Sequence, residues 1–268
     1  MQKPRAVSAG FFRISTMMLR KRNGCVPFSE VTMKESEKAS LKIPGMSARL
    51  LACAGFLRGR ALADIGTDHA YLPSFLAKSG KIPRAVASDI AEGPLRAAER
   101  TLREYGVENL VQLRQGNGLS VIDPGEADDI VIAGMGGDLI VQILSGAPWL
   151  RSERYRIVLQ PMTQEPAVRR WLFDNSFMIL SEKAVLSGGK VYTVMCAEWG
   201  NGSQKEKTLG YFYFGLVDPK TPAGAAYFEK VRRRIQKMLR GAEIRKNTLK
   251  AEEFREILKE MNEKESAS

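Results

Sequence analysis

The stretch Ala63–Pro73, ADIGTDHAYLP, decides the fold of this chain. It ends an apolar run at Gly66 and continues into a predicted helix, with a proline in the first turn, where proline is tolerated. A buried strand that turns through glycine into a helix is typical of a parallel α/β sheet. Two carboxylates, Asp64 and Asp68, flank the glycine, and His69, the single histidine of the chain, follows. These polar residues make the turn the first candidate for a ligand site.

Strand and helix patterns alternate from about residue 46 to residue 200. Buried strands are predicted at 61–66, 84–90, 110–118, 127–137 and 156–161, and helices at 46–57, 70–80, 93–106, 138–147 and 165–177. Residues 178–200 predict two strands joined around Ser187-Gly188-Gly189. Five β–α units and a final hairpin imply a doubly wound, Rossmann-like α/β fold whose parallel sheet has an antiparallel edge. Such a sheet binds ligands at the carboxyl ends of its strands.

The last part of the chain predicts helices alone. Apolar residues recur in steps of three and four from Phe228 to Ala242 and from Phe254 to Met261, with a break near Asn247. We predict two helices that form an antiparallel hairpin or a short coiled coil. The chain then divides into a flexible basic N-terminal extension over residues 1–40, a ligand-binding α/β domain over 41–200 and a C-terminal helical domain over 201–268.

The charge balance favours a polyanionic partner. The 268 residues include 41 Lys and Arg against 30 Asp and Glu, which gives a net charge of +11. Such an excess is typical of proteins that bind nucleic acid, although basic proteins without an acidic partner are also common. The first C-terminal helix carries a basic run that suits either RNA contact or a solvated helix face. On the first interpretation, the RNA-binding residues are Arg232, Arg233 and Arg234.

Cysteine and histidine usage argues against a metal centre. The three cysteines, Cys25, Cys53 and Cys196, are far apart and the chain has one histidine, so the sequence has no Cys/His ligand cluster. An odd number of scattered cysteines favours a reducing compartment. No apolar stretch of the sequence is long enough to cross a bilayer. We therefore expect a cytoplasmic protein that has no metal ion and no membrane partner.

Three ligand classes use this kind of sheet, and the sequence argues against two of them. A nucleoside triphosphate site needs a GxxxxGK[ST] loop, which the chain lacks. A dinucleotide site needs G-x-G-x-x-G, but only its first glycine, Gly66, is present, and Asp68 would repel a pyrophosphate. S-adenosylmethionine carries a sulfonium and an ammonium group and no phosphate, and carboxylates favour such positive charges. We therefore predict S-adenosylmethionine as the cofactor.

Residues at the strand ends supply the predicted cofactor contacts. Asp89 stands 23 residues after Gly66, close to the usual offset of the acid that binds ribose hydroxyls, and Asn117 is placed to bind the adenine amino group. Asp64 suits the fixing of a loop equally well, His69 suits a structural role, and the GMGG run suits a tight turn. The predicted cofactor-binding residues are Asp64, Gly66, Thr67, Asp68, His69, Asp89, Ile90, Gly116, Asn117, Gly118, Gly134 and Met135.

Several motifs between about Met46 and Gly200 together resemble one known family. DIGTDHAYLP, QGNGL, IAGMGG and LQP, the last followed by a helix with Arg170-Trp171-Leu172, resemble the bacterial tRNA (adenine(22)-N(1))-methyltransferase family. The resemblance implies a class I methyltransferase fold, S-adenosylmethionine as methyl donor and N1 of an adenine in the tRNA D-arm as acceptor. The helical tail is similar in character to that family's C-terminal coiled-coil domain.

Two motifs depart from the family pattern. GNG stands where GDG is usual, so Asn117 keeps a side-chain hydrogen bond and loses a charge. Met162 replaces the asparagine of QPN, which removes a polar group from the expected base pocket. Two alternatives therefore stay open: a methyltransferase of the same fold that acts on another RNA or on a small molecule, and an RNA-binding relative without catalysis.

The resemblance also implies a reaction whose chemistry can be matched to residues. N1 of adenine already has a lone pair, so methyl transfer needs positioning rather than a strong base. Asp68 is the candidate for stabilising the cationic product, and either His69 or solvent accepts its proton. Because N1 lies on the Watson–Crick edge, the adenine has to be unpaired or extruded. The candidates for contact with this base are Tyr71, Gly136, Gly137 and Gln160.

Overall fold

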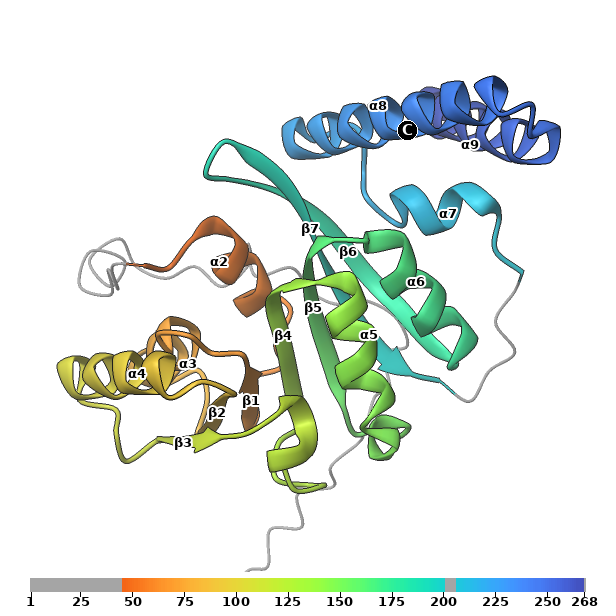
Figure 1. Ribbon diagram of the computed structural model, residues 1–268. Helices are drawn as coiled ribbons and strands as arrows, with labels where there is room; N and C mark the ends of the chain where they lie inside the picture. Colours follow the sequence, from red (N-terminus) through yellow and green to blue (C-terminus); the bar gives the residue numbers. More distant parts are fainter. Residues whose placement is uncertain (1–44, 201–205, 268) are drawn as a thin grey trace, which may run out of the picture.

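The computed structural model describes residues 45–200 and 206–267 (Figure 1). A seven-stranded sheet forms its centre, in the order β3-β2-β1-β4-β5-β7-β6. The strands are β1 (Leu62–Ile65), β2 (Ala85–Asp89), β3 (Val111–Gln115), β4 (Asp129–Gly136), β5 (Arg156–Thr163), β6 (Phe177–Ser187) and β7 (Lys190–Trp199). The predicted extension over residues 1–40 lies outside the described residues.

The first five strands are parallel, and β7 runs antiparallel to both β5 and β6. The predicted Rossmann-like sheet with an antiparallel edge is confirmed. The hairpin turns back on itself, so that β7 rather than β6 pairs with β5. The order of the chain reverses between β1 and β4, which are neighbours in the sheet. The carboxyl ends of these two strands are therefore the expected place for a ligand.

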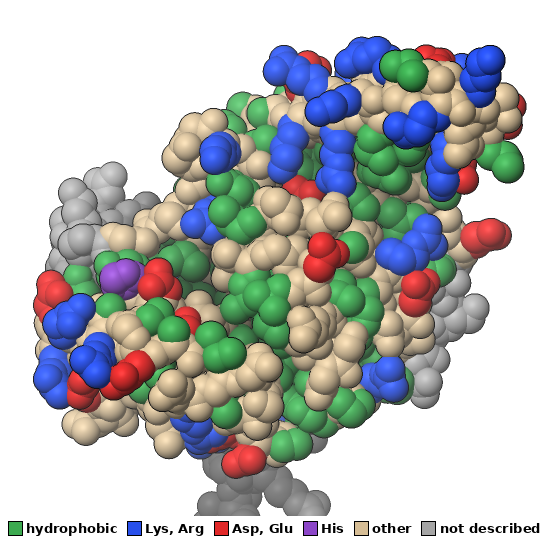
Figure 2. All heavy atoms as spheres, viewed as in Figure 1, with side chains coloured by type: hydrophobic (Ala, Val, Ile, Leu, Met, Phe, Trp, Pro, Cys, Tyr) green, Lys and Arg blue, Asp and Glu red, His purple; other side chains and the backbone are tan. Residues whose placement is uncertain are grey.

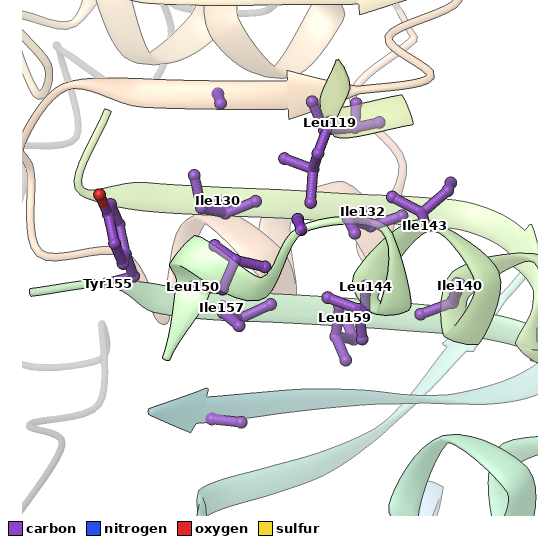
Figure 3. Close-up of a cluster of buried hydrophobic side chains, with 14 of the residues drawn as sticks. Leu119, Ile130, Ile132, Ile140, Ile143, Leu144, Leu150, Tyr155, Ile157 and Leu159 are labelled. Atoms are coloured by element: carbon purple, nitrogen blue, oxygen red, sulfur yellow. The ribbon is translucent and has the colours of Figure 1, made fainter. Parts of the chain in front are cut away.

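Helices cover both faces of the sheet. On one face lie α2 (Ala48–Ala54), α3 (Tyr71–Lys78) and α4 (Glu92–Tyr105), and on the other lie α5 (Gly137–Ser145) and α6 (Glu165–Asp174). Side chains alternate between the faces along each strand: in β4, Val131 packs with the first group, and Ile130 and Ile132 with the second. Figure 3 shows the second cluster, in which α5 packs its isoleucines and a leucine on β4 and β5. The apolar strand segments are explained by this burial on both faces.

Three helices follow the sheet: α7 (Leu209–Phe214), α8 (Pro222–Ile244) and α9 (Thr248–Ala267). The hydroxyl of Thr221 caps α8 by accepting a hydrogen bond from the Gly224 amide at 3.0 Å. The predicted helix pair is confirmed, because α8 and α9 bury a shared apolar cluster that includes Phe228, Ile235 and Met261. The coiled-coil character of this α8–α9 hairpin stays a prediction. The sequence analysis missed α7, a single aromatic-rich segment, LGYFYF, too short to show a period.

A buried polar cluster joins the α7–α9 region to the sheet. The guanidinium of Arg169 on α6, fully buried, donates to Glu182 of β6 at 2.6 Å and to the Tyr227 hydroxyl of α8 at 2.8 Å. It also donates to the main-chain carbonyls of Phe212 and Tyr213 at 2.8 and 2.9 Å. We call Arg169, Glu182 and Tyr227 the buried anchor. Because it connects α6 and β6 to elements further along the chain, it holds α7 and α8 against α6 and β6.

Candidate functional site

The turn after β1 is built around a glycine that no other residue could replace without strain. Gly66 has a φ of +71°, in the left-handed region. A Cβ atom placed on it would lie 2.1 Å from the Cε of Met135, at the end of β4. The amides of Gly66 and Thr67 both donate to the carbonyl of Ser88, at 2.8 and 2.9 Å. The turn is thus pressed closely against the ends of β2 and β4.

The loop from this turn into α3 carries the acidic and aromatic residues of the motif. Asp68 has a φ of +52° and an exposed side chain, which places its carboxylate toward solvent at the rim. The Nε2 of His69 lies 3.6 Å from Asp68 Oδ1. The His69 ring stacks on Tyr71, with centroids 5.1 Å apart and planes within 8°. These three side chains form one polar, aromatic wall.

Asp64 is buried at the end of β1. Its carboxylate accepts a hydrogen bond of 2.6 Å from the Thr67 hydroxyl. Burial raises the pKa of Asp64 to about 6; the Thr67 hydrogen bond opposes this rise and the negative charge of Asp89 adds to it. The Thr67 contact agrees with a loop-fixing role, and the position of Asp64 in a cavity wall agrees with ligand contact.

Asp89 at the end of β2 connects two loops. One carboxylate oxygen accepts from the Ala91 amide at 3.0 Å, and the other lies 3.4 Å from the Asp68 amide. Its neighbour Ile90 is 65% exposed. At the end of β3, the amide of Gly116 donates to the Asp89 carbonyl at 3.0 Å, and Asn117 is exposed. The predicted residues of β2 and β3 therefore share one stretch of the rim.

A cavity of about 220 Å³ opens at the carboxyl ends of β1 and β4. It gathers a first set of predicted residues: Asp64, Gly66, Thr67, Asp68, His69, Tyr71 and Gly134. The remaining predicted cofactor residues lie outside its lining, at the ends of β2, β3 and β4: Asp89, Ile90, Gly116, Asn117, Gly118 and Met135. The cavity is also lined by residues that sequence reasoning missed: Arg49, Leu50, Leu72 and Ala133. Arg49 lies on α2 and reaches the rim from outside every motif.

Gln160 lies at the end of β5 with its side chain fully buried. Its Oε1 accepts hydrogen bonds from Arg49 Nη1 at 2.6 Å and from the Gly134 amide at 3.2 Å. Its Nε2 donates to the carbonyl of Pro161 at 2.9 Å. The side-chain amide of Gln160, which was predicted to contact a base, is thus hydrogen-bonded to protein groups, and it fixes Arg49 and the carboxyl-terminal part of β4.

The glycines after β4 meet protein backbone. A Cβ atom on Gly137 would lie 2.5 Å from the carbonyl oxygen of Gln164. One on Gly136 would lie 3.4 Å from the Thr163 hydroxyl. The close approach of the β4–α5 and β5–α6 turns therefore explains Gly137 structurally, and Gly136 retains room at the rim.

The predicted RNA-binding arginines lie on α8, where Figure 2 shows Lys and Arg side chains gathered over the α8–α9 hairpin. Arg232 pairs with Glu265 of α9, and Arg233 pairs with Glu229 on its own helix at 2.6 Å. Arg234 instead contacts the start of α6, where it donates to the Gln164 side chain at 2.8 Å and lies 3.6 Å from the Glu165 carboxylate. The three residues are thus away from the cavity, and each of them has an acidic partner.

Metal binding and membrane crossing each require a recognisable arrangement of residues. Within residues 45–200 and 206–267, no group of three or more His, Cys, Asp or Glu side chains is arranged to hold a metal ion. In the same ranges, no helix combines the length and the apolar character that crossing a membrane requires. Cys53 and Cys196 are both buried.

The family model described as a methyltransferase domain matches residues 46–195. The chain belongs to this methyltransferase family. The cavity, the glycine turn and the acids at the ends of β1 and β2 all lie within the matched residues.

Relatives of this chain are named as tRNA methyltransferases. The tRNA (adenine(22)-N(1))-methyltransferase of Bacillus subtilis is 39% identical over 157 residues, which are 58% of this chain and 66% of that protein. The chain thus matches slightly less than two thirds of this curated relative. The crystal structure of the B. subtilis M1A22 tRNA methyltransferase TrmK has a TM-score of 0.70 and 31% identity, over 84% of this chain and 99% of that one.

A second solved methyltransferase was crystallised with its cofactor. The Streptococcus pneumoniae protein Sp1610, described as a putative tRNA (m1A22) methyltransferase in complex with S-adenosyl-L-methionine, is 33% identical over 78% of this chain and 98% of its own. Its TM-score is 0.67. The family resemblance that the motifs predicted is therefore confirmed.

Proposed function

We propose that this protein is an S-adenosylmethionine-dependent methyltransferase that methylates N1 of adenine 22 in the D-arm of tRNA. The observation that carries the proposal is the cavity at the ends of β1 and β4. Gly66, whose φ is in the left-handed region, lines this cavity together with the carboxylates of Asp64 and Asp68. The relatives that are 31–39% identical to this chain over the aligned residues are named for this reaction.

The residues present fit the cofactor. S-adenosylmethionine supplies, when bound, a methyl group on a positively charged sulfur. Gly66 leaves room for close backbone approach, and the carboxylates of Asp64 and Asp68 favour positive charge. Asp89, which lies at the rim beyond the Asp68 amide, suits the ribose hydroxyls, and exposed Asn117 suits the adenine amino group. The cofactor would then extend from the cavity along the ends of β2 and β3.

The same wall can serve the acceptor base. An extruded adenine needs a stacking surface, and the parallel rings of His69 and Tyr71 form one at the mouth of the cavity. N1 acts through its own lone pair, so the main task of the chain is to hold the base in line with the methyl group. Exposed Asp68 would stabilise the positive charge of the methylated ring, and His69, 3.6 Å away, would accept its proton.

The α8–α9 hairpin would hold the rest of the tRNA. Its Lys and Arg side chains suit phosphates, which position an RNA without reading its sequence. Arg232 and Arg233 would exchange their acidic partners for phosphates at the surface. We assign the methyltransferase activity to residues 41–200, the RNA grip to residues 201–268, and the protein to the cytoplasm, where its tRNA substrate is found.

The test uses the full chain with donor labelled in its methyl group and two tRNA transcripts that differ at nucleotide 22. We expect label in the transcript with adenine, none in the transcript with guanine, and a reverse-transcription stop at nucleotide 22. Label in both transcripts would indicate another nucleotide, and label in other cell components would indicate another acceptor. Binding of tRNA and donor without transfer would favour the non-catalytic RNA-binding alternative.

A further inference from the structure

Arg49 places a positive charge in a cavity whose other ionised side chains are acids. It lies on α2, and it lines the same cavity as Asp64 and Asp68. A Cβ atom on Gly134 would be 3.9 Å from its Nη1, so the guanidinium lies beside the carboxyl-terminal part of β4. Among the residues that the structure describes, no Asp or Glu forms an ion pair with Arg49.

Neutral contacts fix the position of this guanidinium. Its Nη1 donates to the buried Gln160 Oε1 at 2.6 Å and lies 3.4 Å from the sulfur of Met162. Its carbon lies 5.2 Å from the centre of the Tyr192 ring. These contacts orient the group, and none of them neutralises its charge. A half-buried guanidinium that is held in place by contacts that leave its positive charge uncompensated suits an anionic ligand group.

The cavity therefore has charge of both signs on its walls. Asp64 lies at the end of β1 and Asp68 in the turn after it, and Arg49 lies beside the last residues of β4 and β5. An α-amino acid has the matching pattern, because its ammonium and its carboxylate are attached to one carbon. The donor in the proposed function ends in such a group, the methionine moiety.

We infer that Arg49 binds the α-carboxylate of the methionine moiety of the methyl donor, with Gln160 as the residue that positions it. The inference rests on the proposed function, because it names a contact within that cofactor site. It also gives Met162 a role: its sulfur lies against Arg49 and leaves the charge intact. A phosphate of the target nucleotide is the competing anion, but Arg49 shares its cavity with Gly66 and Asp64, at the predicted cofactor turn.

The test compares two donors that differ by one group. S-adenosylmethionine and its decarboxylated analogue both carry the sulfonium and the ammonium, and the analogue lacks the carboxylate. By calorimetry, we expect the wild-type protein to bind S-adenosylmethionine at least about tenfold more tightly than the analogue, the size of a hydrogen-bonded ionic contact. In Arg49→Met, S-adenosylmethionine should weaken to the level of the analogue, and the affinity for the analogue should stay within about twofold.

Two further variants distinguish the loss of this contact from a general loss of the fold. Gln160→Glu retains the arginine and places a carboxylate beside it, so it should also remove the preference for the carboxylate-bearing donor. Arg96→Met removes an exposed arginine on α4 and should retain the full preference. Thermal melting of each variant identifies any loss of fold.

The outcomes separate the competing explanations. Unchanged donor preference in Arg49→Met would overturn the inference. A rise in KM for tRNA in that variant, with unchanged donor affinity, would also overturn it and would assign Arg49 to a phosphate. A wild-type protein that binds neither donor would refute the proposed function itself, together with the contact that depends on it.

Discussion

Two polar clusters of this molecule are built on opposite rules. In the buried anchor, Arg169 and Glu182 are fully buried, and each charged group has several partners within the protein. In the cavity at the ends of β1 and β4, Asp68 is exposed, and within the described part of the chain Asp64 has one hydroxyl partner and Arg49 has neutral partners alone. In this molecule, charged side chains whose hydrogen bonds are all made within the protein join elements together. Charged side chains that keep hydrogen-bonding capacity free mark a place for a ligand.

The largest effect should come from breaking the anchor. In Arg169→Met, Glu182 would remain buried without its cationic partner, which costs about 3–5 kcal/mol for pairs of this kind. We expect a corresponding fall in the free energy of unfolding, measured with urea. Arg103→Met on α4 removes an exposed ion pair with Glu99 and is the matched control, with an expected change below about 1 kcal/mol. An equal fall in the free energy of unfolding of both variants would show that the buried anchor contributes no more to stability than an exposed ion pair does.

The second effect distinguishes backbone strain from ligand binding. Gly66 and Gly80 both have positive φ, at +71° and +66°, but only a Cβ at Gly66 meets another atom, the Met135 Cε. Gly80→Ala should cost about 1–2 kcal/mol of stability and leave donor affinity unchanged. Gly66→Ala should cost more and should abolish donor binding measured by calorimetry. Normal donor affinity in a folded Gly66→Ala protein would contradict the placement of the cofactor at this turn.

The third effect concerns pH. The pKa of Asp64 is raised by burial to about 6, above its value in the unfolded chain. The native state therefore holds this proton more tightly, and its contribution to stability is lost as the pH rises from about 4 to about 6. The shift corresponds to about 2–3 kcal/mol. Asp64→Asn should remove this part of the pH dependence of unfolding.

The same variant decides between the two roles of Asp64. If its carboxylate faces the donor's ammonium, wild-type affinity for S-adenosylmethionine should rise between pH 5 and pH 7, and the affinity of Asp64→Asn should rise less. An identical pH profile of donor affinity in both proteins would leave Asp64 with the loop-fixing role alone.

The fourth effect lies in turnover. Asp68→Ala should lower kcat for tRNA methylation by about 10–100-fold, because the cationic product loses a nearby carboxylate. Donor affinity should change less, since the exposed carboxylate is at the rim of the cavity. Full turnover by a folded Asp68→Ala enzyme would exclude Asp68 as an essential group.

The smallest effect should come from the hairpin surface. Arg233→Gln removes one exposed charge of α8, and tRNA affinity should fall a fewfold, with the salt dependence reduced by about one unit of slope. Filter binding at several salt concentrations measures both quantities. A salt response that is flat in the wild-type protein would contradict the proposed RNA grip.

The sequence alone predicted the strands and helices that depend on local sequence patterns. The strand that ends at Gly66 and the strand that ends at Asp89 were found because an apolar run followed by glycine or acid is local information. Their side-by-side placement followed from the rules of parallel sheets. The pairing of Phe228 and Ile235 with Met261 followed from helical spacing.

Long-range contacts explain what the sequence analysis missed. Arg49 reaches the cavity through Gln160, 111 residues further along the chain, and no motif contains both. Gln160 was expected to face a base, but its burial depends on how β5 sits beside β4 and α2. The anchor likewise joins Arg169 to Glu182 and Tyr227, and a buried arginine cannot be distinguished from an exposed one by spacing on a helix.

The anchor also limits how the hairpin can move. Swinging α7 and α8 together away from α6 would separate the Tyr227 hydroxyl and the main-chain carbonyls of α7 from Arg169, and it would break the Lys230–Glu165 pair at 2.8 Å. Leaving a buried charge without its partners is too costly for thermal hinge bending. We therefore expect a stiff arm, so that in any encounter the flexible partner has to adjust its shape to the protein.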